Sequence, residues 1–288
     1  MARAKNQNFS KGANIHTRRI IANIVLIFLT LLCLIWFYVL FVNATRSHAH
    51  LTTGFTLVPS SNLIENWKIL NGYALYPLKS MINSVIIAGC SALLCTYFST
   101  MTAYAIHAYD FKAKKVVYTF ILAVMMIPTQ VTALGFIDLV NNMGLMDNFI
   151  PFIIPSIAAP VTFFYMKQYM DSTLPLSIIE SSRIDGAGEF RTFNQIILPI
   201  MKPAIAVQAI FTFVSSWNNY FTPALILKSL DKITLPILLA RLRSMEWNNL
   251  DMGAIYCCIA FAILPVIVVY LCLSKFIVGG VTMGSVKG

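Results

Sequence analysis

The chain has 288 residues, of which 58% are hydrophobic and only 11% are charged, and its formal net charge is +10. Soluble globular domains carry about 25% charged residues, so this chain has too few polar side chains to cover a water-soluble surface. Several uncharged runs are long enough to cross the roughly 30 Å of hydrocarbon in a bilayer. Because a lone segment in lipid must satisfy its own backbone hydrogen bonds, each run is expected to be helical. The composition therefore excludes an ordinary soluble protein and predicts an all-α membrane protein.

The first uncharged run, Ile20–Val42, follows a basic tail that contains Lys11, Arg18 and Arg19. A secretory signal has a shorter apolar core and a small-x-small cleavage site, and this run has neither feature. We therefore interpret it as an uncleaved first transmembrane helix. The residues before it, 1–19, then form a cytoplasmic tail, and residues 43–80 form an extracytoplasmic segment.

Five further apolar runs bring the prediction to six transmembrane helices, with a transmembrane domain at residues 81–274 and a cytoplasmic tail at 275–288. The run at 150–166 is short and contains Pro151, Pro155 and Pro160. The five runs are Met81–His107, Val116–Ile137, Ile150–Met166, Ala204–Thr222 and Ala254–Ser274.

Lysine and arginine are unevenly distributed over the predicted loops, and a membrane protein keeps most of these residues on the cytoplasmic side. With both termini inside, 14 of the 21 basic residues lie in the cytoplasm and seven lie outside. The distribution predicts a multi-pass protein of the cell membrane with cytoplasmic N- and C-termini. Most of the net charge is then this topology signal, with some attraction to the lipid bilayer, and no nucleic-acid partner is needed to explain it. The seven outer residues are Arg46, Lys68, Lys79, Lys228, Lys232, Arg241 and Arg243.

The sequence contains no pattern that is typical of a catalytic or metal site. The six cysteines lie inside predicted spans without a Cys-x-x-Cys pair, and we interpret them as small apolar packing residues. There is no Gly-x-x-x-x-Gly-Lys-Ser/Thr phosphate loop, no nucleophile elbow and no His-Glu-x-x-His motif. We therefore expect no catalytic residue, no metal and no cofactor bound by this chain.

The cores of the predicted spans contain no Asp, Glu, Lys or Arg. Carriers that are coupled to protons or ions usually need buried ionisable groups, because those groups carry the coupling. This composition argues against a self-powered secondary transporter, and it is compatible with a pathway for a neutral, polar solute.

A polar loop separates the fourth and fifth predicted spans, and its sequence predicts a short helix and a turn. Ser172 or Thr173 can cap this helix, and Pro175 suits its first turn. Asp185-Gly186 ends it, since glycine tolerates the left-handed conformation that a helix end often requires.

A second, amphipathic helix is expected to begin near Gly188, with Glu189 at its positive N-terminal end. Pro199 and Pro203 end it before the next span. The loop is then either a connector or a docking element for a soluble cytoplasmic protein, with apolar anchors ringed by charge. Phe190, Phe193 and Ile197 are predicted to share one face, while Arg191 and Asn194 face away.

The spacing in this loop resembles the EAA loop of binding-protein-dependent ABC importer permeases. The match begins at Glu180, reaches Gly186 and closes at Leu198-Pro199, within a loop that spans residues 171–202. The family's usual Ala-Ala is Ser181-Ser182 here, and serine is small enough for a tight helical contact.

Other segments resemble the maltose-type permeases, specifically the shorter six-span partner of a permease pair. The resemblance covers most of the chain after Gly54 and implies a carbohydrate importer with a type I ABC importer permease bundle. The segments are Phe55–Pro59, Glu65–Trp67, Asn83–Val85, Met126–Pro128, Trp217–Tyr220 with Pro223, and Gly280–Gly288.

The resemblance also implies partners. A second permease subunit completes the pore, two cytoplasmic ABC ATPase subunits use ATP and magnesium, and an extracytoplasmic sugar-binding protein delivers the solute. Glu180 would anchor the loop to the ATPase, Gly186 would make the turn, and Ala187 and Phe190 would fill the ATPase cleft. The full set of coupling residues is Glu180, Ser181, Ser182, Asp185, Gly186, Ala187, Phe190, Leu198 and Pro199.

Uncharged hydrogen-bonding residues in or near the spans are candidates for the solute pathway, and Trp217 and Tyr220 could stack on sugar rings. Interhelical hydrogen bonds and the interfacial aromatic belt explain such residues equally well. In maltose-type systems, moreover, the other permease chain supplies most sugar contacts. The candidates are Gln130, Gln208, Ser215, Asn218, Asn219 and Tyr220.

Two alternatives remain open. The same kind of importer could carry a non-sugar solute such as a polyamine or phosphate, although a cation pathway would be expected to place acidic residues in the spans. A non-ABC channel or secondary carrier is the other alternative, and it would leave the spacing of the loop unexplained.

Overall fold

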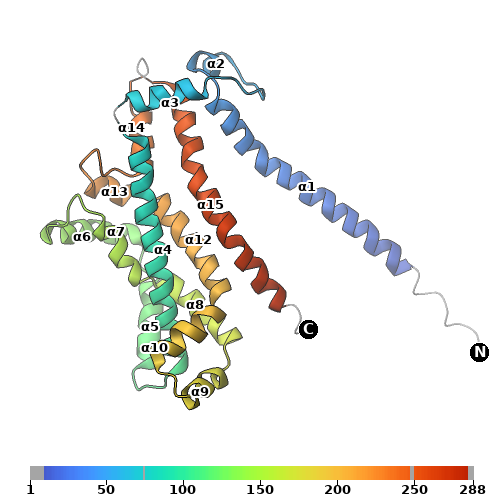
Figure 1. Ribbon diagram of the computed structural model, residues 1–288, viewed down its shortest axis with the longest axis vertical. Coiled ribbons are helices and arrows are strands. Elements are labelled where there is room, and N and C mark those ends of the chain that lie inside the picture. The colour runs from blue at the N-terminus through green and yellow to red at the C-terminus, as the bar shows by residue number, and fades with distance from the viewer. Residues whose placement is uncertain (1–9, 74, 247–249, 285–288) are drawn as a thin grey trace, which may run out of the picture. The chain divides into compact units, whose positions relative to one another are not determined.

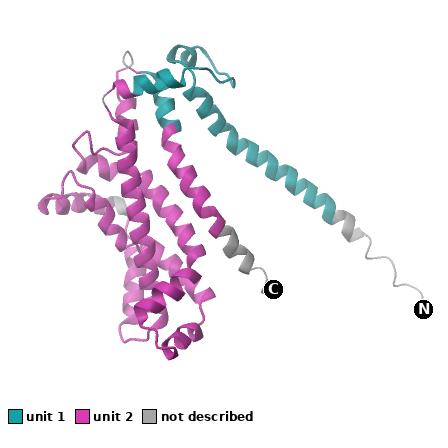
Figure 2. Ribbon diagram, in the orientation of Figure 1, with its two compact units in different colours: residues 1–70, 251–260 teal, residues 71–250, 261–288 magenta. Residues whose placement is uncertain are grey.

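The computed structural model describes residues 10–73, 75–246 and 250–284, and in these ranges it is built from helices without a strand (Figure 1). The prediction of an all-α fold is therefore confirmed. The chain divides into two compact units, which are residues 1–70 with 251–260 and residues 71–250 with 261–288 (Figure 2).

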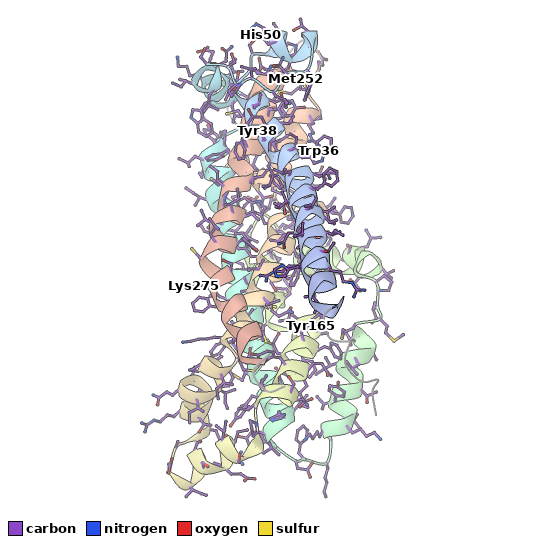
Figure 3. The ribbon with its side chains drawn as sticks, turned by 90° about the vertical axis from the view of Figure 1, so that its right-hand side faces the viewer. Trp36, Tyr38, His50, Tyr165, Met252 and Lys275 are labelled. Carbon is purple, nitrogen blue, oxygen red and sulfur yellow. The ribbon has the colours of Figure 1, made fainter. Side chains whose placement is uncertain are left out.

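The first unit contains α1 (Ser10–Ala44), α2 (His48–Thr53), most of α3 (Leu63–Gly72) and the start of α15 (Met252–Gly284). α1 begins upstream of the expected start of the first span and continues as one helix through the apolar run. Its apolar side chains are largely exposed, and Trp36 is 71% exposed (Figure 3). A long helix that is apolar on all sides and exposed suits a lipid environment.

Buried polar groups hold the end of α1 to α3. The Asn66 side chain is almost fully buried, and its Nδ2 donates to the carbonyl oxygens of Ala44 at 2.8 Å and Arg46 at 2.9 Å. The Arg46 guanidinium is also buried and donates to the carbonyl oxygens of His50 and Gly54. The two side chains therefore satisfy backbone carbonyl groups around the end of α1.

Gly253, in the first turn of α15, faces this network within the same unit. A Cβ at this position would lie 2.5 Å from Oδ1 of Asn66 and 2.7 Å from the carbonyl oxygen of Arg46. The preceding residue, Met252, is labelled in Figure 3, and its backbone N–H donates to Nδ1 of His48 at 3.1 Å. Glycine is required here because the backbone approaches the network too closely for any side chain.

The second unit is built around α4 (Pro77–Ala108), against which α8 (Pro160–Thr173) and α12 (Lys202–Trp217) pack. Small and hydroxyl side chains form the buried face of α4, and they allow neighbouring helices to approach closely. These residues include Ala88, Ser91, Ala92, Cys95, Thr96, Ser99, Thr100 and Ala103. The other helices of this unit before the polar loop are α5 (Lys114–Val124), α6 (Thr129–Asn142), α7 (Ile150–Ile153) and the 3-10 turn η1 (Ile154–Ile157).

Two polar residues near the start of α4 fix the chain that leads into α14 (Leu235–Arg243). Nδ2 of Asn83 donates to the carbonyl oxygens of Asp231 and Ile233, both at 3.0 Å. Oγ of Ser84 accepts the backbone N–H of Leu235 at 2.8 Å and so satisfies a donor in the first turn of α14. The short helix α13 (Phe221–Ile226) precedes this segment.

Within the described residues, four helical stretches are long and apolar enough to cross a membrane, or five if one bent pair counts as a single span. The bent pair is Glu189–Ile200 with Lys202–Trp217, whose two parts meet at 80°. The four stretches are Ile15–Ala44, Pro77–Ala108, Ile150–Thr173 and Met252–Phe276.

The expectation of one continuous helix over Val116–Ile137 was wrong. α5 ends at Val124, and α6 begins at Thr129 after an extended residue, Pro128, with φ −62° and ψ 129°. Proline has no backbone N–H to continue the helix, and it disfavours the helical conformation of the residue before it.

Candidate functional site

The polar loop between α8 and α12 consists of four short helical pieces. α9 (Leu176–Ile184) and α10 (Glu189–Thr192) flank a turn, and a π-helical segment η2 (Phe193–Ile197) then leads into α11 (Leu198–Ile200). The fold of two helices around a turn, expected from the sequence, is therefore present.

The N-terminal caps differ from the expectation. Ser172 and Thr173 do not cap α9, because α8 continues to Thr173 and both hydroxyls donate back to the carbonyl oxygen of Tyr169. Pro175 is the residue before α9, with an extended ψ of 140°, and does not lie in its first turn. Gly188 precedes α10 as expected, with Glu189 in the first turn.

Gly186 makes the turn with φ +76°, the left-handed conformation that the sequence predicts at this position. Its backbone N–H donates to the carbonyl oxygen of Arg183, and the N–H of Ala187 donates to that of Ser182, both at 3.0 Å. These two bonds form a Schellman motif, which satisfies the last carbonyls of α9. Any β-branched side chain at Gly186 would be strained in this conformation.

A buried hydroxyl pair joins the two helices of the loop. Oγ of Ser182 and Oγ1 of Thr192 are 2.6 Å apart, and both residues are buried. Ser182 is the second residue of the small pair Ser181-Ser182 that the sequence analysis compares with Ala-Ala. The serine therefore keeps the small volume and adds a hydrogen bond to α10.

Apolar side chains anchor the loop on α4 and α8. Ile179, Phe193 and Ile197 are buried in one cluster with side chains of both long helices. Phe190 was expected on the same face, but its side chain is 73% exposed. The segment after it is π-helical, so the spacing of residues that share a face differs from that of an α-helix. The main partners on the long helices are Ala103, Tyr104, Ile106, Phe163, Met166 and Met170.

A charged group braces the loop against the end of α4. Arg183 Nε donates to Oε1 of Glu189 at 2.8 Å, and the hydroxyl of Tyr104 donates to Oε2 at 2.7 Å. The Arg183 guanidinium carbon lies 5.2 Å from the ring centroid of Tyr109. Glu189 therefore accepts from a residue of α9 and from a residue of α4, which links both to α10.

The outer surface of the loop presents two large apolar side chains. Ile184 is 86% exposed and Phe190 is 73% exposed, on opposite sides of the turn. Glu180, Ser181 and Asp185 are exposed as well. Among the other predicted coupling residues, Ala187 and Leu198 are partly buried and Pro199 is exposed.

The contribution of Glu189 to the stability of this loop can be measured with two matched tyrosines of α4. Tyr104 donates to the Glu189 carboxylate, whereas Tyr97 donates to the amide oxygen of Asn194 at 3.3 Å. Hydrogen bonds to charged groups contribute about 1.5–3 kcal/mol, against about 1 kcal/mol for neutral ones. Thermal unfolding of the purified protein should therefore show a larger fall in Tm for Tyr104→Phe than for Tyr97→Phe. Equal falls would mean that Glu189 does not brace the loop.

A cavity of about 880 Å³ lies elsewhere in the second unit, with walls from α4, α6, α8, α12 and α13. Hydroxyl and amide groups contribute to its lining, and none of the described lining residues is charged. Three of the predicted pathway residues, Gln208, Ser215 and Asn219, lie in this lining. All three come from one predicted span, Ala204–Thr222, and the structure adds walls from α4, α6 and α8 around them.

Two polar side chains of the cavity lining have no hydrogen-bond partner among the described residues. Oγ1 of Thr234 is buried and unpartnered, and the Gln208 side chain, 7% exposed, makes no bond. Buried polar groups are usually hydrogen-bonded, so these two are available to a solute or to water. Thr234 was missed at the sequence level, because it lies in a loop outside the predicted spans.

Two other predicted pathway residues, Asn218 and Tyr220, do not line the cavity. Asn218 is exposed, and Tyr220 is 47% exposed outside the lining. The side chain of Gln130 lies outside the described residues. Trp217 is buried and stacks on Phe213 with ring centroids 5.7 Å apart, so the proposal that it stacks on a sugar was wrong.

Asp147 connects the chain after α6 to the chain after α13, and both helices form cavity walls. Its carboxylate accepts from the backbone N–H groups of Lys228 and Ser229, from the Ser229 hydroxyl and from Nζ of Lys232. Burial alone would raise the pKa of Asp147, but the hydrogen bonds from Ser229, Lys228 and Lys232 outweigh it and hold the pKa well below its usual range. The carboxylate therefore stays charged at any physiological pH.

The described part of the chain contains neither a candidate metal site nor a disulfide bond. No group of three His, Cys, Asp or Glu residues there is placed to hold a metal ion. All six cysteines are free thiols, at positions 33, 90, 95, 257, 258 and 272.

A large part of the chain matches a known protein family. Residues 96–282 match the family described as "Binding-protein-dependent transport system inner membrane component". This range covers the end of α4, α5 to α14 and most of α15, and it therefore includes the polar loop and most of the cavity lining.

Individual relatives agree with this match. The arabinooligosaccharides transport system permease protein AraQ of Bacillus subtilis (strain 168) is 36% identical over 234 residues, which cover 80% of this chain and 81% of that protein. The maltodextrin transport system permease protein MdxG of the same organism is 31% identical over 270 residues, covering 91% and 95%. A solved bacterial ABC transporter involved in the import of the acidic polysaccharide alginate has a chain with the same fold, at a TM-score of 0.77 and 22% identity, covering 94% of this chain and 99% of that one.

Proposed function

The chain belongs to the family of binding-protein-dependent transport system inner membrane components, and from this premise we propose that it is a permease subunit of an ATP-driven importer for a sugar or an oligosaccharide. The sugar assignment is supported by the relatives, whose names include arabinooligosaccharides, maltodextrin, and melibiose, raffinose and stachyose as cargo. The chain would form half of a translocation pore and couple it to a cytoplasmic ATPase.

The observation that carries this proposal is the construction of the polar loop. Ile179, Phe193 and Ile197 are buried against the long helices, while Ile184 and Phe190 project outward from the same short segment. A loop that only joined two spans would have no reason to expose its large apolar side chains on a rigidly braced turn. Exposed apolar anchors ringed by charge are typical of a docking surface.

The proposed partner at this surface is a cytoplasmic ABC ATPase. Phe190 would insert into a cleft of the ATPase, with Ala187 beside it, and the exposed carboxylate of Glu180 would anchor the first helix. Because Gly186 fixes the angle between α9 and α10, both apolar anchors would move together with the ATPase. ATP and magnesium would be used by that partner.

The proposal also includes a membrane topology and two further partners. Both termini and the polar loop would lie in the cytoplasm, a second permease subunit would complete the pore, and an extracytoplasmic binding protein would deliver the solute. The protein would have no enzymatic activity of its own. Its site would be the pore, with energy supplied by the partner ATPases.

The uncharged cavity is the proposed part of the solute path in this chain. Hydroxyl and amide groups such as Ser215, Asn219 and Gln208 can exchange hydrogen bonds with the hydroxyls of a sugar. A phosphate or a polyamine carries charge, and a cavity without a charged side chain offers neither ion a partner. The cavity therefore favours a neutral, polyhydroxylated solute over these two alternatives.

A single substitution tests the role of the cavity. Gln208→Leu removes an unpartnered amide of similar size from the cavity wall, so transport should weaken, with KM rising roughly ten-fold for the loss of hydrogen bonds to the solute. Gln168→Leu is the matched control, because Gln168 is exposed on α8 and does not line the cavity. Unchanged uptake kinetics in Gln208→Leu would remove this cavity from the proposed path.

The proposed function as a whole is tested by purification and reconstitution. Affinity purification of the chain from its native membranes should return an ATPase, a second permease subunit and a binding protein. In liposomes, this complex should take up malto- or arabino-oligosaccharides only when ATP and the binding protein are present. The chain purified alone should neither hydrolyse ATP nor move sugar, and proton-driven uptake by the lone chain would contradict the proposal.

A further inference from the structure

A second, smaller pocket of about 570 Å³ lies at the end of α4, between the start of α5 and α8. Its lining is rich in positive charge, with four lysines against two aspartates. The lysines are Lys112, Lys114, Lys115 and Lys167. The polar loop and the uncharged cavity described above leave this group of charges unexplained.

The acidic side chains of the pocket leave three of its lysines without a partner. Asp171 is already bound, since Lys167 Nζ lies 2.6 Å from its Oδ2 and His107 Nδ1 lies 2.8 Å from its Oδ1. The other nitrogen of His107 is held by the carbonyl oxygen of Leu174 at 3.0 Å. Asp110 is exposed and forms no ion pair among the described residues.

The unpartnered lysines converge from one short segment. Lys112 and Lys115 are exposed, Lys114 is partly buried, and none of the three forms an ion pair in the described part of the chain. They also precede or begin α5, where the partial positive charge of the helix end adds to their own. A bound anion would relieve the mutual repulsion of these three charges.

The pocket lies where two candidate membrane spans end. The candidate span of α4 ends at Ala108, shortly before the segment of lysines, and the candidate span that contains α8 ends at Thr173, two residues after Asp171. On α5, one turn apart, the side chains of Val116 and Phe120 are 70% and 67% exposed. Positive groups at the end of a span next to an exposed apolar stripe match the head and the acyl chain of an anionic amphiphile.

We propose that this pocket binds the phosphate headgroup of an anionic phospholipid, with Lys112, Lys114 and Lys115 as its ligands and Val116 and Phe120 along an acyl chain. The inference rests on the proposed topology only in placing the lipid in the cytoplasmic leaflet. Lipid in this position would support the start of α5 and the end of α8, next to Leu176, the first residue of α9.

The test compares two triple variants of the full transporter in nanodiscs that contain equal parts of phosphatidylglycerol and phosphatidylcholine. The first variant carries Lys112→Ala, Lys114→Ala and Lys115→Ala. The control variant carries Lys68→Ala, Lys228→Ala and Lys275→Ala, which remove the same charge elsewhere. After extraction into detergent, native mass spectrometry counts the phosphatidylglycerol that each protein retains. The first variant should bind phosphatidylglycerol at least roughly ten-fold more weakly than the wild type, and the control should bind it within about two-fold of the wild type.

Three further outcomes would each overturn the proposal of a lipid site. Equal retention by the two variants would overturn the proposal. Displacement of the lipid by inorganic phosphate would identify a free-phosphate site and would also overturn it. Loss of the ATPase from the first variant, with its lipid retained, would identify a protein-docking surface instead. The proposed transport function is tested separately, because lipid retention is measured without uptake.

Discussion

Replacement of Gly186 by valine is expected to release the ATPase from this permease while leaving its membrane spans intact. Gly186 has φ +76°, and a β-branched side chain in that conformation costs about 1–3 kcal/mol. A Cβ at Gly186 meets no atom within 4 Å, so the effect comes from the backbone and not from a clash. The strained turn would change the angle between α9 and α10, and ATPase affinity should fall roughly ten-fold or more. The measurement is the amount of ATPase that co-purifies with the variant, together with uptake.

Two control substitutions make this result specific. Gly188→Val places the same side chain two residues away, where φ is −67° and the backbone is extended, so ATPase binding should be largely retained. Gly186→Asn should also be close to wild type, because asparagine tolerates the left-handed conformation better than other side chains. Full ATPase binding and normal uptake in Gly186→Val would show that the loop is only a connector. Glu180→Ala should be milder, since it removes one proposed anchor and leaves the backbone path intact.

Substitution of Gly253 by alanine is expected to destabilise the first unit strongly. The new Cβ would lie 2.5 Å from Oδ1 of Asn66 and 2.7 Å from the carbonyl oxygen of Arg46, and the second of these atoms belongs to the backbone. Overpacking of this kind costs about 1–3 kcal/mol and sometimes more. Samples of Gly253→Ala and wild type are heated, and size-exclusion chromatography measures how much protein stays folded at each temperature. The variant should show a clear fall in Tm. Asn66 would also be pushed away from the carbonyls of Ala44 and Arg46 that it satisfies.

The matched control for this prediction is Gly89→Ala in α4. A Cβ there meets no atom within 4 Å, and alanine is a better helix former than glycine by up to about 1 kcal/mol. The two glycine-to-alanine changes should therefore shift Tm in opposite directions. Adding Asn66→Ala to Gly253→Ala should not restore stability, since the clash with the Arg46 carbonyl remains. A Tm for Gly253→Ala equal to that of the wild type would contradict the structure of this unit.

The turn of the polar loop could be predicted from the sequence because its cause is local. Asp185-Gly186 at the end of a short helix requires a left-handed residue, and the structure confirms it with the bonds of a Schellman motif. The position of Phe190 could not be predicted in the same way. It depends on the π-helical turn that follows, and that turn places Phe193 and Ile197 in a pocket made by α4 and α8.

Hydropathy alone predicted the long helices correctly, but it did not predict where an apolar run is broken into two helices. α1, α4 and α15 are single helices that cover the predicted runs, because each run is long and apolar. The run from Val116 to Ile137 has the same composition, yet Pro128 divides it. That proline is visible in the sequence, and giving it more weight than the apolar composition would have corrected the prediction.

The cavity was predictable only in part. Gln208, Ser215 and Asn219 are polar residues in or next to one predicted span, so their common position was a reasonable expectation. Ser84 and Thr234 come from distant segments, and their meeting depends on how α4 packs against the chain before α14. Trp217 was misjudged because a large aromatic side chain near the end of a span can be buried as easily as exposed, and here it packs on Phe213.

The central claim is that the exposed face of the polar loop docks on a cytoplasmic ATPase, and site-specific photo-crosslinking tests it most directly. A photoreactive phenylalanine analogue is placed at Phe190, which is 73% exposed, and in a second sample at Phe55, which is 74% exposed in the other unit. In intact membranes, the probe at Phe190 should form one main product with the ATPase subunit, and ATP should change its yield. The probe at Phe55 should form none. The account would be contradicted if the probe at Phe190 gave no ATPase product, or if a cysteine at the exposed Arg191 were labelled by an impermeant reagent from outside the cell.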